Sequence, residues 1–169
     1  LDEAFLDVTE SVTPDRTPAD IARKLKSRVK AELDLTISVG VATSKSVAKI
    51  ASDMDKPDGL TIVSPSSERK FLAPLAVEKL WGIGPKTTER LGDEGIRTVG
   101  DLATQSEEWF RAWFGKTGPQ LRELALGRDD RPVVVHRDRK SVSAETTMAQ
   151  DTGDPEVLYE LVNRLSQRV

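Results

Sequence analysis

The 169-residue chain contains no cysteine and a single histidine, His136. Without thiols it forms no disulfides, zinc-thiolate sites or iron-sulfur clusters. The lone histidine has no second histidine or cysteine to pair with, so we interpret it as a linker residue. Long apolar runs are also missing, and no stretch predicts a membrane span or a signal peptide. We therefore expect an intracellular protein.

An excess of positive charge is missing too, because 25 Lys and Arg are outnumbered by 28 Asp and Glu. A net charge of −3 argues against nucleic acid as a partner, but local clusters of cations matter more than the sum. The helix predicted to start at Thr17-Pro18 has one apolar stripe and many cations. We interpret its basic residues as a solvated face in preference to a DNA contact. They are Arg23, Lys24, Lys26, Arg28 and Lys30.

Two adjacent carboxylates, Asp2 and Glu3, stand near the start of the sequence. Hard cations such as Mg²⁺ take oxygen ligands and keep positions open for substrate phosphates, so a converging pair is part of a coordination shell. In a regular strand the pair points to opposite faces and converges only at a turn or bulge. The apolar residues 4–8 predict a buried strand. There Asp7 either faces solvent, which we prefer, or supplies a further ligand.

Residues 36–54 predict a strand followed by a helix. The strand, at 36–42, is rich in β-branched residues and is expected to pair with residues 5–8. Ser44 caps the predicted helix, 45–54.

Three lysines project from the start, the middle and the exit of this helix: Lys45, Lys49 and Lys56. Such lysines usually serve solubility. Beside a metal-carboxylate site, ammonium groups also neutralise the charge that develops on a triphosphate during nucleotidyl transfer.

A helix-hairpin-helix is predicted by residues 80–91, Leu-Trp-Gly-Ile-Gly-Pro-Lys-Thr-Thr-Glu-Arg-Leu. Its glycines make a tight turn, and the helix after them presents free backbone N–H groups to a phosphate. Such a contact positions DNA without reading sequence. An ordinary interhelical turn is the alternative, and Gly84 is the expected site of a positive φ or a close backbone approach. The predicted DNA-binding residues are Gly82, Ile83, Gly84, Lys86 and Thr87.

The remaining central residues predict a small helical domain. A weaker Gly-Pro hairpin occurs at 115–122, and residues 98–101 form a capping box. Four aromatic residues follow at helical spacing. We interpret them as core side chains, although base-stacking platforms are the alternative. They are Trp109, Phe110, Trp113 and Phe114.

Beyond Gly127 the sequence becomes basic and partly extended, then changes again. Alternation at 141–148 predicts a strand, and a helix is predicted to start at Asp154 or Pro155 and to run through Leu165.

Residues 1–8, 38–45 and 48–59 together resemble the Y-family translesion DNA polymerases of the DinB or DNA polymerase IV type. In that family an Asp-Glu pair supplies two of three catalytic carboxylates, which matches Asp2 and Glu3. The resemblance thus implies a two-metal Mg²⁺ site at this pair.

The resemblance also implies nucleotide and DNA contacts. Lys56, before Pro-Asp-Gly, resembles the family residue that contacts the triphosphate, and Lys49 matches a basic position of the same helix. Arg137 and Arg139 lie in a segment similar to the family's basic tether and join the predicted DNA-binding residues.

The implied fold class is α+β. The expected domains are a partial palm of antiparallel strands with helices (1–63), an all-helical thumb (64–131), a tether (132–140) and the start of an α/β little finger (141–169).

The implied function is template-directed nucleotidyl transfer by an error-prone translesion polymerase. Its expected partners are primer-template DNA, a deoxynucleoside triphosphate and, in the full-length protein, a sliding clamp. We expect it in the cytoplasm, at the nucleoid if bacterial. The family's first catalytic aspartate and fingers precede the Asp-Glu pair, and this chain starts at Leu1, so we expect an incomplete and inactive catalytic core.

Two other functions stay open from the sequence. Helix-hairpin-helix DNA glycosylase-lyases carry a similar turn whose lysine, here Lys86, acts as a Schiff-base nucleophile. That family is all-helical and does not explain the first sixty residues. A non-catalytic DNA-binding module is the third interpretation.

Overall fold

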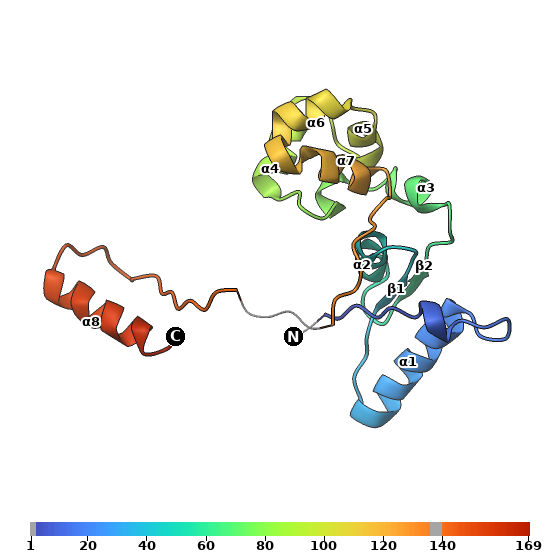
Figure 1. Cartoon of the computed structure of the whole chain (residues 1–169), viewed down its shortest axis with the longest axis horizontal. Coiled ribbons are helices and arrows are strands. Elements are labelled where there is room, and N and C mark those ends of the chain that lie inside the picture. The colour runs from blue at the N-terminus through green and yellow to red at the C-terminus, as the bar shows by residue number, and fades with distance from the viewer. Residues whose placement is uncertain (1–2, 136–139) are drawn as a thin grey trace. The chain divides into compact units, whose positions relative to one another are not determined.

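The computed structural model describes residues 3–135 and 140–169. The chain divides into two compact units, Leu1–Val133 and Val134–Val169 (Figure 1). The first unit combines a small α/β part with a helical part, and the described residues of the second contain one helix. The α+β fold class is therefore confirmed.

The α/β part contains a parallel strand pair joined by a helix. Val39 pairs with Leu60 and Val41 with Ile62, and the helix between the strands packs against both (Figure 1). Gly40 permits this packing, because a Cβ there would lie 2.0 Å from the carbonyl oxygen of Ala48. The elements are η1 (Thr9–Ser11), α1 (Pro18–Leu33), β1 (Val39–Val41), α2 (Lys45–Met54) and β2 (Leu60–Ile62).

The predicted strand at 4–8 is wrong, and so is its pairing with residues 36–42. Asp7 Oδ1 accepts hydrogen bonds from Thr9 N (3.0 Å) and Thr9 Oγ1 (2.7 Å), which turns the chain into η1. A local side-chain acceptor thus competes with a strand ladder. The expected antiparallel palm strands do not occur among residues 3–135 and 140–169, where β1 and β2 run parallel.

Helix α1 begins as predicted, with a reciprocal capping box between Thr17 and Asp20. The solvated face is confirmed for Arg23 and Arg28, which pair with acidic residues of the same helix. Lys26 differs, because its side chain is 18% exposed and its Nζ donates to the carbonyl oxygen of Ile37 at 2.6 Å.

The helical part is stabilised by the predicted caps. Thr98 and Asp101 form the expected capping box, and Gly118-Pro119 opens a helix. The helices are α3 (Glu68–Leu72), η2 (Val77–Lys79), α4 (Pro85–Asp93), α5 (Val99–Ala103), α6 (Glu107–Phe114), η3 (Gly115–Thr117) and α7 (Gly118–Ala125).

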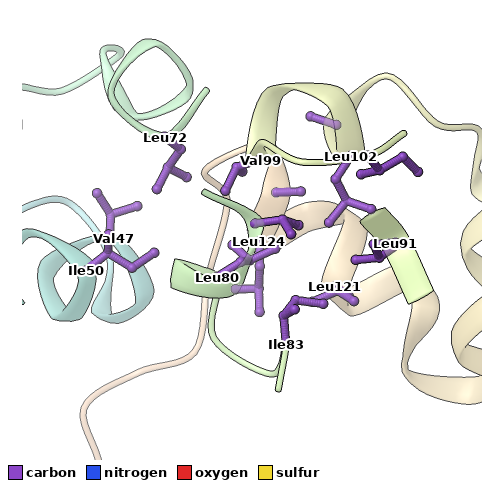
Figure 2. Close-up of a cluster of buried hydrophobic side chains, with 14 of the residues drawn as sticks. Val47, Ile50, Leu72, Leu80, Ile83, Leu91, Val99, Leu102, Leu121 and Leu124 are labelled. Atoms are coloured by element: carbon purple, nitrogen blue, oxygen red, sulfur yellow. The ribbon is translucent and has the colours of Figure 1, made fainter. Parts of the chain in front are cut away.

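One hydrophobic cluster connects both parts of the first unit. Figure 2 shows Val47 and Ile50 of α2 close to Leu72 of α3, and the cluster continues into the helical part through Leu80 and Leu102. Phe110 is fully buried, and Trp109, Trp113 and Phe114 pack against the cluster. The interpretation of the aromatic residues as core is confirmed.

The second unit contains α8 (Pro155–Ser166), which Asp154 caps by accepting from the Glu156 N–H. Residues 141–148 form no strand, so that prediction is wrong, since a single extended segment finds no partner for its backbone groups. In the described part of the chain, no helix has the length and apolar character that crossing a membrane requires.

Candidate functional site

Helix α2 arranges two of its predicted lysines around one carboxylate. Asp53 Oδ2 lies 2.8 Å from Lys49 Nζ, and its Oδ1 lies 2.5 Å from Lys56 Nζ. Helical spacing explains the first contact, because Asp53 is one turn after Lys49 in α2. Lys56 lies two residues beyond the end of α2, at Met54, and its side chain reaches back to Asp53. Lys45 differs: its Nζ donates to the carbonyl oxygen of Pro132 at 2.8 Å.

Glu3 joins this cluster from the start of the chain. Lys49 Nζ lies 2.7 Å from Glu3 Oε1, although the two residues are 46 positions apart. One predicted catalytic carboxylate and the two predicted triphosphate lysines therefore belong to one chain of ion pairs. Its two ammonium and two carboxylate groups sum to zero charge.

The hydrogen bonds favour the charged forms of Lys49 and Asp53. The bond to Asp53, then the bond to Glu3, raises the pKa of Lys49 above its ordinary value. Burial acts to raise the pKa of Asp53, but the bonds from Lys49 and Lys56 outweigh it and hold that pKa below its ordinary value. Both pKa shifts stabilise the ion pair between Lys49 and Asp53.

The predicted metal pair is only half described. Glu3 has a hard oxygen donor and a side chain that is 52% exposed, which fits a ligand of Mg²⁺. Asp2 lies outside the described residues. Within residues 3–135 and 140–169, no three carboxylate or imidazole groups lie close enough to hold a metal ion. Asp7 is exposed, as preferred from the sequence, and its Oδ1 accepts hydrogen bonds from Thr9.

The hairpin at 80–85 exposes the start of a helix. Ile83 is buried and anchors the turn, while Gly82, Gly84 and Lys86 are exposed. Pro85 occupies the first turn of α4, and the N–H groups of Thr87 and Thr88 both donate to the Gly84 carbonyl oxygen. The free helix start and the lysine beside it can bind an anion.

The glycines of this hairpin have different roles from those predicted. The positive φ, +100°, belongs to Gly82, whereas Gly84 has φ −100° and is the N-cap of α4. The prediction of a positive φ at Gly84 is therefore wrong. Within the described structure a Cβ there would meet no atom within 4 Å, and the close approach of a phosphate stays a prediction. The space in front of Gly84 is open to solvent.

The predicted DNA-binding residues Arg137 and Arg139 lie outside the described residues, as does His136. Two other residues that contact the site were missed in the sequence. Asp53 was missed, although its spacing from Lys49 and Lys56 could have revealed it. Asp129 was also missed: it lies beside Ser46, a contact across 83 residues that no local pattern predicts.

Two family models match the chain. The impB/mucB/samB family matches residues 1–53, and the IMS family HHH motif matches residues 65–96. The second match includes the hairpin at 80–85 and ends before the Gly-Pro pair at 118–119.

Relatives of known name cover the whole chain. DNA polymerase IV of Legionella pneumophila (strain Corby) is 44% identical over 173 residues, covering 100% of this chain and 49% of the relative. DNA polymerase IV of Methanoculleus marisnigri (strain JR1) is 46% identical over 169 residues, covering 100% of this chain and 47% of the relative. The chain thus spans about half the length of these relatives.

Solved structures support the same relationship. A Y-family DNA polymerase chimera of Dbh and Dpo4 has a TM-score of 0.76 and 29% identity, covering 89% of this chain and 44% of that one. A Dbh ternary complex has a TM-score of 0.68 and 28% identity, covering 97% of this chain and 50% of that one. With the fold, both family models and the relatives in agreement, the chain belongs to the Y-family DNA polymerases of the DinB, or DNA polymerase IV, type.

Proposed function

We propose that this chain is the part of a translesion DNA polymerase that contributes two catalytic carboxylates, the triphosphate lysines and a duplex-holding hairpin. Its substrates are primer-template DNA and a deoxynucleoside triphosphate, and a sliding clamp is a further partner of the full-length protein. In domain terms, residues 1–63 belong to the palm, 64–131 to the thumb, 132–140 to the tether and 141–169 to the little finger.

Asp2 and Glu3 are proposed to hold the divalent metal ion that Y-family polymerases require, which we take to be Mg²⁺. When bound, it supplies a Lewis acid for the primer 3′-hydroxyl and the nucleotide phosphates. Lys56 and Lys49 are proposed to neutralise charge on the triphosphate. At the hairpin, Gly82, Ile83, Gly84, Lys86 and Thr87 are proposed to contact duplex backbone, together with Arg137 and Arg139 of the tether.

The observation that carries the proposal is the ion-pair chain that links Glu3, Lys49, Asp53 and Lys56. Residues far apart in the sequence, singled out for a metal and for a triphosphate, thus meet around Lys49 and Asp53 of α2. Exposed ion pairs stabilise a fold by at most about 1 kcal/mol. Fold stability alone therefore gives little reason for these residues to be together, whereas a shared site for metal and triphosphate does.

Single-turnover nucleotide incorporation tests the roles in a full-length polymerase that carries this segment. Asp2→Ala and Glu3→Ala should abolish primer extension and leave duplex binding nearly intact. Lys56→Ala should weaken transition-state binding by about 2 to 4 kcal/mol. Lys24→Ala, an exposed lysine of α1, is the matched control and should change neither rate nor affinity. Retained turnover in both carboxylate variants refutes the metal assignment.

The glycosylase-lyase interpretation is not favoured, because a polymerase-family model matches residues 1–53, which that all-helical family does not explain. Borohydride trapping on an abasic-site duplex separates the two functions. We expect no covalent adduct at Lys86.

A further inference from the structure

The connector after α7 contains an almost completely buried carboxylate. The side chain of Asp129 is 2% exposed, and Arg131 binds both its oxygens, with Nε 2.6 Å from Oδ1 and NH2 2.9 Å from Oδ2. Asp129 Oδ2 also accepts a hydrogen bond from Ser46 N at 3.1 Å. Because burial of a charge is costly unless it is paired, this contact is well defined in space.

The group that Asp129 contacts is the start of α2. Ser44, the N-cap residue, makes no side-chain cap bond, and its Oγ is buried without a partner in the described structure. A carboxylate at this position satisfies an amide that lacks an intrahelical acceptor and interacts favourably with the helix dipole. Asp129 therefore supplies the cap that the local sequence does not.

Arg131 extends the contact to the hairpin. Its guanidinium carbon lies 4.6 Å from the ring centroid of Trp81, the residue directly before Gly82. On the Trp81 ring, Phe5 stacks with a centroid separation of 6.3 Å and an interplanar angle of 21°. A pair of residues in the connector thus contacts the first turn of α2 and the hairpin together.

The end of α7 directs the connector to this place. Gly127 N donates to Leu124 O and Arg128 N to Glu123 O, the pattern of a Schellman motif. Gly127 has φ +79°, and a Cβ there would lie 2.8 Å from Glu68 Cβ. Only glycine fits this turn without displacement, and the residues after it reach α2.

We propose that Asp129 and Arg131 are positioning residues that hold the start of α2 at a fixed separation from the hairpin turn. Lys45 strengthens this attachment by donating to Pro132 O. The functional part of this inference rests on the proposed function, since α2 then carries Lys49, with Lys56 two residues beyond its end, and the hairpin then holds the duplex. The attachment itself does not depend on that function.

Amide exchange measured by NMR on the chain tests the attachment. In Asp129→Ala we expect the Ser46 amide to exchange about tenfold faster or more, because a hydrogen bond to a charged group is lost. Asp130→Ala removes the neighbouring exposed carboxylate and should leave that amide unchanged. Unchanged Ser46 exchange in Asp129→Ala, with α5 amides still protected, overturns the proposal.

Coupling to the hairpin is tested with Trp81→Leu. The Ser46 amide should then exchange faster although Trp81 does not touch it, while Tyr159→Leu, a change to an exposed aromatic of the other unit, should have no effect. If Asp129→Ala does not fold, Arg131→Leu replaces it: the Ser46 amide should exchange faster and the Trp81 indole resonance should move. If a folded Arg131→Leu variant shows neither change, the coupling is refuted.

In a full-length polymerase that carries this segment, Asp129→Ala should lower kcat or raise the nucleotide KM several-fold without loss of duplex affinity. If Asp129→Ala speeds the exchange of the Ser46 amide but leaves kcat and KM unchanged, Asp129 only stabilises the fold and its positioning role is refuted. If the unmodified enzyme synthesises no DNA, the proposed function fails while the exchange result still decides the attachment.

Discussion

The two Gly-Pro hairpins of the helical part look alike in sequence and differ in structure. At the first, Gly84 is exposed, and an added Cβ would meet nothing within 4 Å. At the second, Gly118 is buried, and an added Cβ would lie 2.2 Å from the carbonyl oxygen of Phe110. One glycine leaves space for a ligand, and the other lets α7 pack directly on the backbone of α6. A glycine before a proline therefore does not by itself identify a phosphate site.

The largest expected effect is on the packed hairpin. Gly118→Ala forces a methyl group against backbone that cannot rotate away, so it should lower the free energy of unfolding by about 3 kcal/mol. Urea denaturation measures this change, and Gly92→Ala, on an open face of α4, is the control. A loss below about 1 kcal/mol contradicts the packing role.

Gly82→Ala should have the next largest effect on stability. Its φ of +100° is strained for any residue with a Cβ, so we expect a loss of about 1 to 3 kcal/mol in the free energy of unfolding. Gly84→Ala has no such conflict, because its φ of −100° suits any residue. Thermal unfolding of both variants compares the glycines within one turn, and equal losses speak against the difference.

Gly84→Val should separate binding from stability. We expect less than about 1 kcal/mol of destabilisation, from the poorer N-cap. Duplex affinity should fall about tenfold, equally for two unrelated sequences, because the side chain fills the space a phosphate needs. Fluorescence anisotropy measures both duplexes. A preference between them, or no change in a folded variant, means that the hairpin is only an interhelical turn.

The smallest expected effect distinguishes the lysines of the two hairpins. Lys86→Ala should reduce the slope of log affinity against log salt by about 0.9, which is one phosphate contact. Lys116→Ala, in the second hairpin, should leave the slope unchanged. If both variants reduce the slope equally, both hairpins contact DNA and the proposed difference between them is wrong.

Local signals in the sequence predicted much of this fold. The capping boxes at Thr17 and Thr98 and the helix α8 follow from interactions within one or two turns, which neighbouring residues determine. The range of α2 was also predicted, but its predicted cap was wrong, because the Ser44 side chain makes no cap bond. The strands predicted at 4–8 and 141–148 failed because a strand depends on a partner distant in sequence.

In the candidate site, too, single residues were predicted from local patterns, while their partners in the packed fold were not. Lys49 and Lys56 were identified, while the carboxylate that holds both, Asp53, was read only as part of the helix. The turn at Gly82 was placed correctly, but its positive φ was assigned to Gly84. The contact between Asp129 and Ser46 depends on the packed fold, so no residue pattern along the chain indicates it.

The cap of α2 also affects the order in which the protein folds during synthesis. Asp129 follows Ser46 by 83 residues, and at 5 to 20 residues per second the ribosome needs roughly 4 to 17 seconds to add them. During that interval β1, α2 and β2 can already pair through local contacts, but the first turn of α2 has no carboxylate to close it. Completion of α2 is therefore a late event that waits for translation of the whole helical part, and a ribosome-bound chain that ends before Asp129 should show an unprotected Ser46 amide.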